Sequence, residues 1–257
     1  MTEIDVLIEN SIATVALNRP AQRNAITLAM WKEIARTFED LGKDAAVRVI
    51  ILTGLGGNFS VGADISEFDK VRSGIGQSAS YEAAVDASSD AIASCPKPTI
   101  SVVAGYCLGG GCHLCMACDF RFAGPTASFG IPAGRLSIVY GLRSTQRLFA
   151  LVGVAEAKRI LFSGDRFDGA EAMRIGFAQA MADDPMEAAR KFGSRLSDNA
   201  PLSIVGAKFM VDGLAMGPGT LDEREVQAII DRASASDDYA EGRRAFAEKR
   251  KPVFRGR

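Results

Sequence analysis

The sequence predicts an α/β fold, and two observations carry that prediction. Over residues 1–199, short apolar runs with strand character recur and alternate with helical segments, a strand–strand–helix pattern that is typical of α/β cores. After Ala200-Pro201 the helical spacing continues without a strand pattern. We therefore expect an α/β core over residues 1–199 and a helical region over residues 200–257.

The first half of the core begins with an expected hairpin. Residues 4–9 and 12–17 alternate polar and apolar side chains around Asn10-Ser11. Thr27 is an expected helix N-cap, because apolar residues recur at helical spacing after it as far as Gly42. The other elements expected before residue 99 are a buried strand at Val47–Thr53, a glycine-rich loop at Gly54–Asp64, a short helix near Ile65–Phe68, a mobile loop at Ser73–Ser80 and a helix at Tyr81–Ser94.

The second half repeats the alternation and then becomes helical. Its expected strands are residues 99–103, 119–122 and 127–129, and its expected helices are residues 110–117, 154–161, 168–175, 184–196, 201–213, 220–235 and 237–249. A helical region of this length rarely buries both of its faces alone. We therefore expect the last three helices to pack on the core or on a neighbouring subunit.

Composition excludes several classes of protein. The 257 residues are 47% hydrophobic and 24% charged, as in an ordinary globular domain. The 30 basic and 31 acidic residues nearly cancel, which argues against long-range attraction to nucleic acid. The first residues carry acids and show no signal-peptide pattern, so a cytoplasmic location is expected. Residues 99–118 lack charges, but glycines interrupt them, so no membrane-spanning segment is expected.

Three consecutive glycines, Gly109 to Gly111, join an apolar strand to an apolar helix. The first turn of a helix leaves backbone N–H groups unpaired and carries a partial positive charge. An anionic oxygen or a polarised carbonyl is therefore the natural partner of this junction. His113, the only histidine in the chain, falls on the first full turn beside it.

Cys112, Cys115 and Cys118 recur at a spacing that also occurs in metal and iron–sulfur sites. No fourth cysteine follows at a cluster spacing, and the intervening residues are apolar. We interpret the three thiols as small buried apolar side chains and expect no metal.

Four motifs lie in order along nearly the full length of the chain. They are Leu17-Asn-Arg-Pro20 with Asn24-Ala25, Gly57-Asn-Phe-Ser-Val-Gly-Ala-Asp-Ile65, Ala104-Gly-Tyr-Cys-Leu-Gly-Gly-Gly-Cys112 and Phe246-Ala-Glu-Lys-Arg-Lys-Pro252. Together they resemble the crotonase family, also called the enoyl-CoA hydratase/isomerase family. The resemblance implies a crotonase-like spiral of strand–strand–helix (ββα) repeats with a C-terminal helical oligomerisation region, assembled as a homotrimer or a dimer of trimers. It also implies an acyl-CoA thioester substrate, with coenzyme A as part of the substrate rather than a separate cofactor.

The same resemblance implies which residues contact the substrate. The backbone N–H groups of Ala63 and Gly110 would hold the thioester oxygen, where an enolate develops negative charge. Asp64 is expected to cap a helix rather than to act as an acid. The remaining residues implied at the substrate or its coenzyme A are Arg23, Ala25, Asp64, Ile65 and, from a neighbouring subunit, Phe246 and Lys249. Lys249 has an alternative interpretation as part of a solvated cationic helix end.

The resemblance also implies two catalytic glutamates that this chain lacks. His113 stands at the first position, three residues after Gly110, and Ala133 stands at the second. Hydration requires one group to deprotonate water and another to protonate the α-carbon, so standard hydration is not expected. The helix N-terminus disfavours imidazolium, and we expect a neutral His113 that acts as base or hydrogen-bond partner. The alternative is a buried histidine with a purely structural place in the core.

Tyr140 falls where the methylmalonyl-CoA decarboxylase branch of the family has a tyrosine. Three functions follow as alternatives. The first is a crotonase-family lyase or isomerase that stabilises an enolate, with His113 working alone if it hydrates. The second is a malonyl- or methylmalonyl-CoA-type decarboxylase with Tyr140 or His113 as proton donor, and the third is a non-catalytic acyl-CoA-binding protein. A purely structural alternative for Tyr140 is an aromatic side chain in a loop, with its hydroxyl hydrogen-bonded to the backbone.

Overall fold

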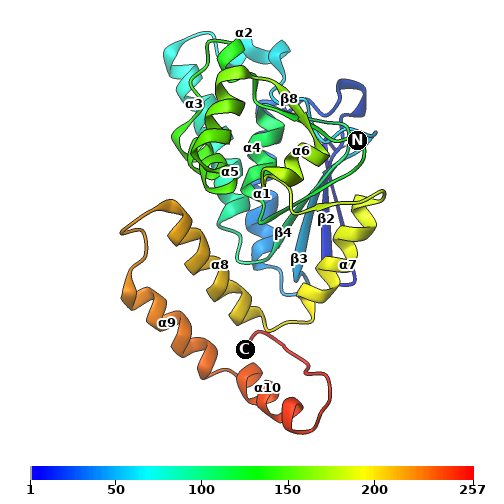
Figure 1. Cartoon of the computed structure of the whole chain (residues 1–257), viewed down its shortest axis with the longest axis vertical. Helices are drawn as coiled ribbons and strands as arrows, with labels where there is room; N and C mark the ends of the chain where they lie inside the picture. The colour runs from blue at the N-terminus through cyan, green and yellow to red at the C-terminus, as the bar shows by residue number, and fades with distance from the viewer. Residues whose placement is uncertain (1) are drawn as a thin grey trace.

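A six-stranded sheet forms the centre of the computed structural model, which describes residues 2–257 (Figure 1). Its strands lie in the order β1 (Ile4–Glu9), β2 (Ile12–Leu17), β3 (Val49–Gly54), β4 (Thr99–Val103), β6 (Phe120–Ala123) and β9 (Ala180–Met181). The hairpin of β1 and β2 is antiparallel, as expected, and each later neighbour pairs in parallel. This arrangement confirms the expected α/β class.

Helices cover both faces of this sheet, which explains why its central strands are continuously apolar. In β3, Ile50 and Leu52 face the main core, whereas Val49 and Ile51 face a second cluster under one helix. The helices of the core are α1 (Leu28–Lys43), α2 (Phe68–Val71), α3 (Ile75–Ala93), α4 (Gly110–Ala117), α5 (Leu142–Ser163), α6 (Gly169–Arg174) and α7 (Pro185–Ser197). α7 forms the second cluster, and α1, α3 and α4 pack on the main core.

α1 begins where the sequence predicts. The Thr27 hydroxyl accepts a hydrogen bond from Met30 N over 3.2 Å and so caps the helix. The apolar side chains at helical spacing all point into the core, and Trp31 and Phe38 are completely buried. α1 packs along α3, so the two helices form one wall of the core.

A second, smaller sheet corrects one expectation about the glycine junction. It consists of β5 (Tyr106–Leu108), β7 (Ser128–Gly130) and β8 (Arg166–Asp168), with β5 parallel and β8 antiparallel to β7. The strand that runs into the glycines is therefore β5 and not the expected strand at 99–103, which ends at Val103. Gly105, with φ +53°, turns the chain between the two sheets. The junction thus stands at the place where the chain leaves the large sheet.

Two further expectations about local structure were wrong. The expected mobile loop at Ser73–Ser80 is instead helical from Ile75 onward, and the Gln77 side chain accepts hydrogen bonds from Ser73 N and Oγ just before the helix begins. The expected helix at 154–161 is only the second part of α5, which begins at Leu142. A non-helical glycine inside α5, Gly153 with φ 75°, interrupts the spacing that would have revealed its first half.

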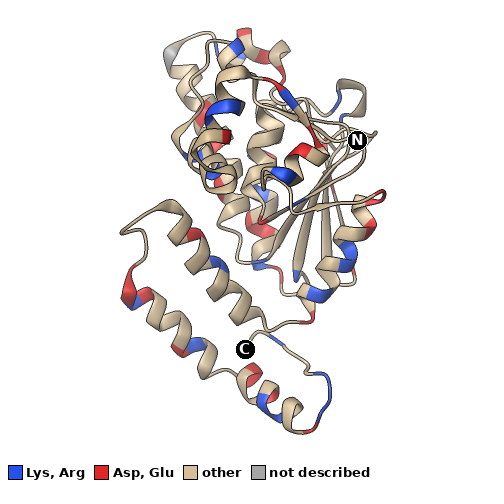
Figure 2. Ribbon diagram, viewed as in Figure 1, with Lys and Arg blue, Asp and Glu red and all other residues tan. Residues whose placement is uncertain are grey.

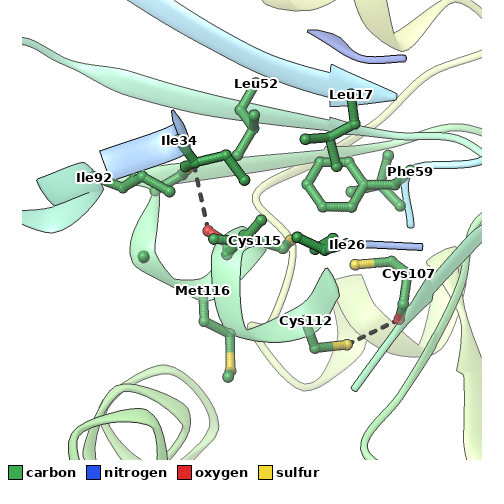
Figure 3. Close-up of a cluster of buried hydrophobic side chains, with 14 of the residues drawn as sticks. Leu17, Ile26, Ile34, Leu52, Phe59, Ile92, Cys107, Cys112, Cys115 and Met116 are labelled. Carbon is green, nitrogen blue, oxygen red and sulfur yellow. Dashed lines mark hydrogen bonds between the residues drawn. The ribbon is translucent and has the colours of Figure 1, made fainter. Parts of the chain in front are cut away.

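The buried cysteines lie within the apolar core (Figure 3). Cys107, Cys112 and Cys115 are completely buried among side chains such as Ile26 and Phe59, and Cys112 Sγ donates to Cys107 O over 2.9 Å. Within the described residues, no group of three or more His, Cys, Asp or Glu side chains is arranged to hold a metal ion. The contacts of these thiols are those of small apolar residues.

The last three helices, α8 (Pro201–Met216), α9 (Glu223–Ser234) and α10 (Asp237–Ala247), extend away from the sheets (Figure 1). α8 contacts α5, and α10 contacts chiefly α9. Positive and negative side chains are mixed along all three helices (Figure 2). Several large apolar side chains on them are exposed, among them Val211, Leu214 and Phe246. None of the described helices has the length and apolar character required to cross a membrane.

Candidate functional site

The loop that carries Ala63 is held against the strand that leads into the glycine junction. Ser60 N donates to Tyr106 O over 2.8 Å, and Leu108 N donates to Ser60 O over 2.9 Å. These bonds form a short parallel bridge between the loop and β5. Two segments that are far apart in the sequence therefore lie side by side at the start of α4.

The loop and the start of α4 approach each other so closely that both carry a glycine at the contact. Gly62 has φ +95°, and a Cβ there would lie 2.7 Å from Leu108 O and 3.0 Å from Gly110 N. A Cβ on Gly110 would lie 3.3 Å from Ala63 N and 3.0 Å from the Trp31 ring. The backbone nitrogens of Ala63 and Gly110 therefore border the same narrow space.

The N–H groups of Ala63 and Gly110 are available to a ligand. Neither donates to a backbone acceptor in the part of the chain that the structure describes. Gly110 is the first residue of α4, where a helix has no internal acceptor for it. On either side of Ala63, Gly62 O accepts from Ile26 N over 2.8 Å and Asp64 N donates to Ile26 O over 2.9 Å. Two N–H groups fixed in this way can bind an oxygen on which negative charge develops.

Asp64 caps the short 3-10 helix that follows Ala63, as expected. Its carboxylate accepts from Ser66 N over 3.1 Å and from Ser66 Oγ over 2.6 Å. The other carboxylate oxygen accepts from Arg19 over 2.8 Å. These hydrogen bonds hold the pKa of Asp64 below its ordinary value. The bond from Ser66 has the largest effect, and the bond from Arg19 has the next largest. The residue is an ionised acceptor, and exposed Ile65 begins the helix beside it.

His113 is buried between α3 and α5, and both of its ring nitrogens are hydrogen-bonded. Nε2 lies 3.2 Å from Val85 O, and Nδ1 lies 2.5 Å from Ser144 Oγ. Since a carbonyl can only accept, Nε2 carries the proton and Nδ1 accepts from the Ser144 hydroxyl. Burial, assisted by repulsion from Arg147, lowers the pKa of His113 to about 4. The ring is neutral, as expected, although burial rather than the helix end is the main cause.

A buried, neutral His113 predicts a loss of stability in acid. Its pKa is about 4 in the folded chain against an ordinary value of 6.5, so between these values the unfolded chain binds a proton that the folded chain excludes. The stability contribution is complete above pH 6.5 and is lost as the pH falls toward 4. Between pH 7 and pH 5 we expect a loss of about 2 kcal/mol from this residue. Urea unfolding at both pH values measures it, and His113→Gln is expected to remove that part of the pH dependence. An equal pH dependence in the variant would contradict this account.

Tyr140 contacts the edge of the His113 ring, with ring centroids 6.4 Å apart. Its hydroxyl is buried and has no hydrogen-bond partner within the described residues. Burial raises the pKa of Tyr140 well above its ordinary value, so the phenol keeps its proton. Tyr140 and Ala133 also line an apolar cavity of about 570 Å³ that is bordered by Val139 and Leu142. An unpaired buried hydroxyl is costly, and a catalytic role is one of the explanations for such a group in a native structure.

A single chain brings together only part of the residues expected at coenzyme A. Arg23 and Ala25 lie in the turn between β2 and α1, whose backbone is bonded to the loop that carries Ala63. Phe246 lies in the last turn of α10 and Lys249 lies just after that helix, and α10 lies well away from α4 in Figure 1. Phe246 is 88% exposed. Among the described residues, no extensive contact joins α10 to α4, the helix that begins at the glycine junction.

Sequence reasoning assigned no role to Ser144, Val85 or Arg19. Ser144 and Val85 hold His113 from α5 and α3, which are distant in the sequence from α4 and from each other. No local spacing connects these positions, so no sequence pattern could have linked them. Arg19 lies inside the motif Leu17-Asn-Arg-Pro20. Because Asp64 is distant from it in the sequence, their ion pair could not be predicted from local spacing.

Comparison with known protein families gives a match over nearly the whole chain. The family described as Enoyl-CoA hydratase/isomerase matches residues 7–257. A probable enoyl-CoA hydratase of Mycobacterium tuberculosis is 34% identical over 261 residues, which cover 99% of each chain. The 2,3-dehydroadipyl-CoA hydratase of Escherichia coli is 30% identical over 262 residues, which cover 100% of each chain.

Solved structures agree with the sequence comparison. The crystal structure of an enoyl-CoA hydratase/carnithine racemase from Magnetospirillum magneticum superposes with a TM-score of 0.94 at 34% identity, covering 100% of this chain and 97% of that one. The enoyl-CoA hydratase of Bacillus anthracis gives a TM-score of 0.89 at 29% identity and covers 100% of both chains. The chain therefore has the crotonase fold and belongs to the enoyl-CoA hydratase/isomerase family, a family of enzymes.

Proposed function

We propose that this protein binds an acyl-CoA thioester, holds the thioester oxygen between the N–H groups of Ala63 and Gly110, and stabilises the enolate that forms. The observation that carries the proposal is the meeting of these two backbone nitrogens at one narrow space beside the Trp31 ring. Donors aimed at a developing oxyanion contribute most of the catalysis in many acyl-transfer and enolate reactions. Membership of the family supports the acyl-CoA thioester as the ligand.

The surroundings of this oxyanion hole favour decarboxylation over hydration. Hydration needs a base for water. At the two positions where the resemblance implies glutamates, this chain has Ala133 and His113, and both nitrogens of His113 are engaged in hydrogen bonds. Decarboxylation of a malonyl-type thioester needs no such base. It needs an enolate-stabilising hole and one proton donor, and the unpaired Tyr140 hydroxyl supports that second role.

The proposed decarboxylation proceeds in three steps. The bond between the α-carbon and the carboxylate of a malonyl- or methylmalonyl-CoA breaks, and carbon dioxide leaves. The electron pair passes into the thioester carbonyl as an enolate, held by Ala63 and Gly110. The enolate α-carbon then takes the proton of the Tyr140 hydroxyl, and water returns a proton to the phenolate.

A panel of acyl-CoA substrates separates this proposal from its alternatives. We expect mass spectrometry to show loss of carbon dioxide from malonyl- or methylmalonyl-CoA and, in deuterated water, one deuterium at the α-carbon of the product. Crotonyl-CoA at high enzyme concentration is expected to remain unhydrated. Rapid hydration that is abolished in His113→Ala would instead establish a hydratase with His113 working alone. Tight binding with no conversion across the panel would establish a non-catalytic acyl-CoA-binding protein.

The assembly of the protein is a further part of the proposal. We infer that residues 200–257 form the oligomerisation region of a homotrimer or a dimer of trimers. The exposed apolar side chains of α8 to α10 support this inference, because they lack a partner within one chain among the described residues. In such an assembly Phe246 and Lys249 would reach the coenzyme A of a neighbouring subunit. A cytoplasmic location belongs to the same proposal and is supported by five unpaired, buried cysteines.

A further inference from the structure

We propose that Arg19 is a positioning residue that sets the direction of the Ala63 N–H and links it to the turn that carries Arg23 and Ala25. The inference rests on the proposed oxyanion hole and extends it to a side chain that does not touch the substrate. Its basis is a set of contacts in which one guanidinium joins two segments of the site.

The first contact joins Arg19 to the residue after Ala63. Arg19 Nη1 lies 2.8 Å from Asp64 Oδ2, and the two side chains are only 17% and 11% exposed. Because solvent screens such a pair weakly, and because the planar guanidinium offers donors in fixed directions, the pair holds a defined geometry. The ion pair therefore anchors the peptide that follows Ala63.

The second contact joins the same nitrogen to the turn between β2 and α1. Arg19 Nη1 donates to Ala25 O over 2.7 Å, and Arg19 N donates to Asn24 Oδ1 over 2.9 Å. Arg23 and Asn24 both have positive φ, 49° and 56°, which non-glycine residues rarely adopt. The turn therefore needs further bonds to keep its shape. Arg19, which lies at its start, supplies one of them from its backbone N–H and one from its guanidinium, and only the second is removed in Arg19→Met.

The backbone between these anchors leaves Ala63 little freedom. Ile26, directly after Ala25, bonds to the residues on both sides of Ala63 through Gly62 O and Asp64 N. Arg19 ties the side chain of Asp64 to the carbonyl of Ala25 across this bridge. A shift of the turn is thus transmitted to the Ala63 peptide, and an error of about 1 Å in such a donor can cost about a hundredfold in rate.

Infrared spectroscopy of a bound thioester tests the inference directly. The probe is butyryl-CoA with a ¹³C label at the thioester carbonyl, whose stretching frequency falls when N–H groups polarise it. In the wild-type protein we expect a shift to lower frequency. In Arg19→Met we expect most of that shift to be lost and kcat to fall by about tenfold to a hundredfold. KM for the acyl-CoA is expected to change less than kcat, and Arg19→Lys is expected to recover part of the shift.

Arg36→Met is the matched control, because Arg36 pairs with Glu33 on the surface of α1 and is 68% exposed. It is expected to keep the full carbonyl shift. A full shift in Arg19→Met would overturn the role of Arg19 while leaving the oxyanion hole intact. Absence of any shift in the wild type would instead overturn the proposed function. If Arg19→Met does not fold, Asp64→Asn breaks the same ion pair with little change of shape, and a full shift in that variant overturns the inference equally.

Discussion

Tyr140→Phe is expected to make the protein more stable and much less active. The Tyr140 hydroxyl is buried without a partner within the described residues, so its removal relieves a desolvation cost of about 1 kcal/mol or more. The same hydroxyl is the proposed proton donor to the enolate, and loss of a general acid lowers kcat by about 10²- to 10⁴-fold. Opposite changes in stability and activity distinguish a functional hydroxyl from a merely structural one.

Urea unfolding and turnover of malonyl- or methylmalonyl-CoA measure the two effects. Tyr81→Phe is the matched control, because the Tyr81 hydroxyl accepts a hydrogen bond from Trp31 Nε1 over 2.9 Å. Its loss leaves that buried donor unpaired and is expected to cost about 1–3 kcal/mol. A less stable Tyr140→Phe with unchanged kcat would show that the hydroxyl bonds within the protein in solution and takes no part in the reaction.

Gly110→Pro is expected to abolish turnover and to leave part of the affinity for coenzyme A. Proline removes one of the two N–H donors, and the loss of a single oxyanion-hole donor costs about 10²- to 10³-fold in kcat. The added ring also enters the space beside Ala63, where a Cβ on residue 110 would already lie 3.3 Å from Ala63 N. We therefore expect a loss larger than that for the missing donor alone.

The helix itself tolerates this substitution. Gly110 is the first residue of α4, a position at which proline is common because the missing N–H has no acceptor in the helix. Gly169→Pro, at the first residue of α6, is the corresponding control and is expected to keep full activity. Thermal unfolding and the affinity for free coenzyme A show whether Gly110→Pro remains folded. Full activity in a folded Gly110→Pro protein would mean that the proposed hole is not used.

Much of the fold could be predicted from local patterns. The β1–β2 hairpin, the Thr27 cap and the helix after the glycine junction follow from spacing and capping within a few residues of each position. α5 could not be delimited in the same way, because Gly153 interrupts its helical spacing. Local patterns also could not reveal that the chain changes sheets at Gly105, since pairing of β5 with β7 is a tertiary contact.

The candidate site was predictable only in part, for a similar reason. Ala63 and Gly110 are proposed to act through their backbones, and the glycines that make room for them are visible in the sequence. The state of His113 depends on Val85 and Ser144, which three-dimensional packing brings to its two nitrogens. The sequence therefore predicts a neutral His113 that acts as base or hydrogen-bond partner, whereas in the structure both of its nitrogens are hydrogen-bonded.

We propose above all that Ala63 and Gly110 together hold a thioester oxygen. A crystal structure of the protein with bound butyryl-CoA, a saturated thioester that cannot be hydrated or decarboxylated, tests this claim most directly. We expect the thioester oxygen at about 2.7–3.1 Å from both backbone nitrogens, with the Tyr140 hydroxyl on the side of the α-carbon. A thioester oxygen that contacts neither nitrogen, with the acyl group bound elsewhere in the chain, would contradict it.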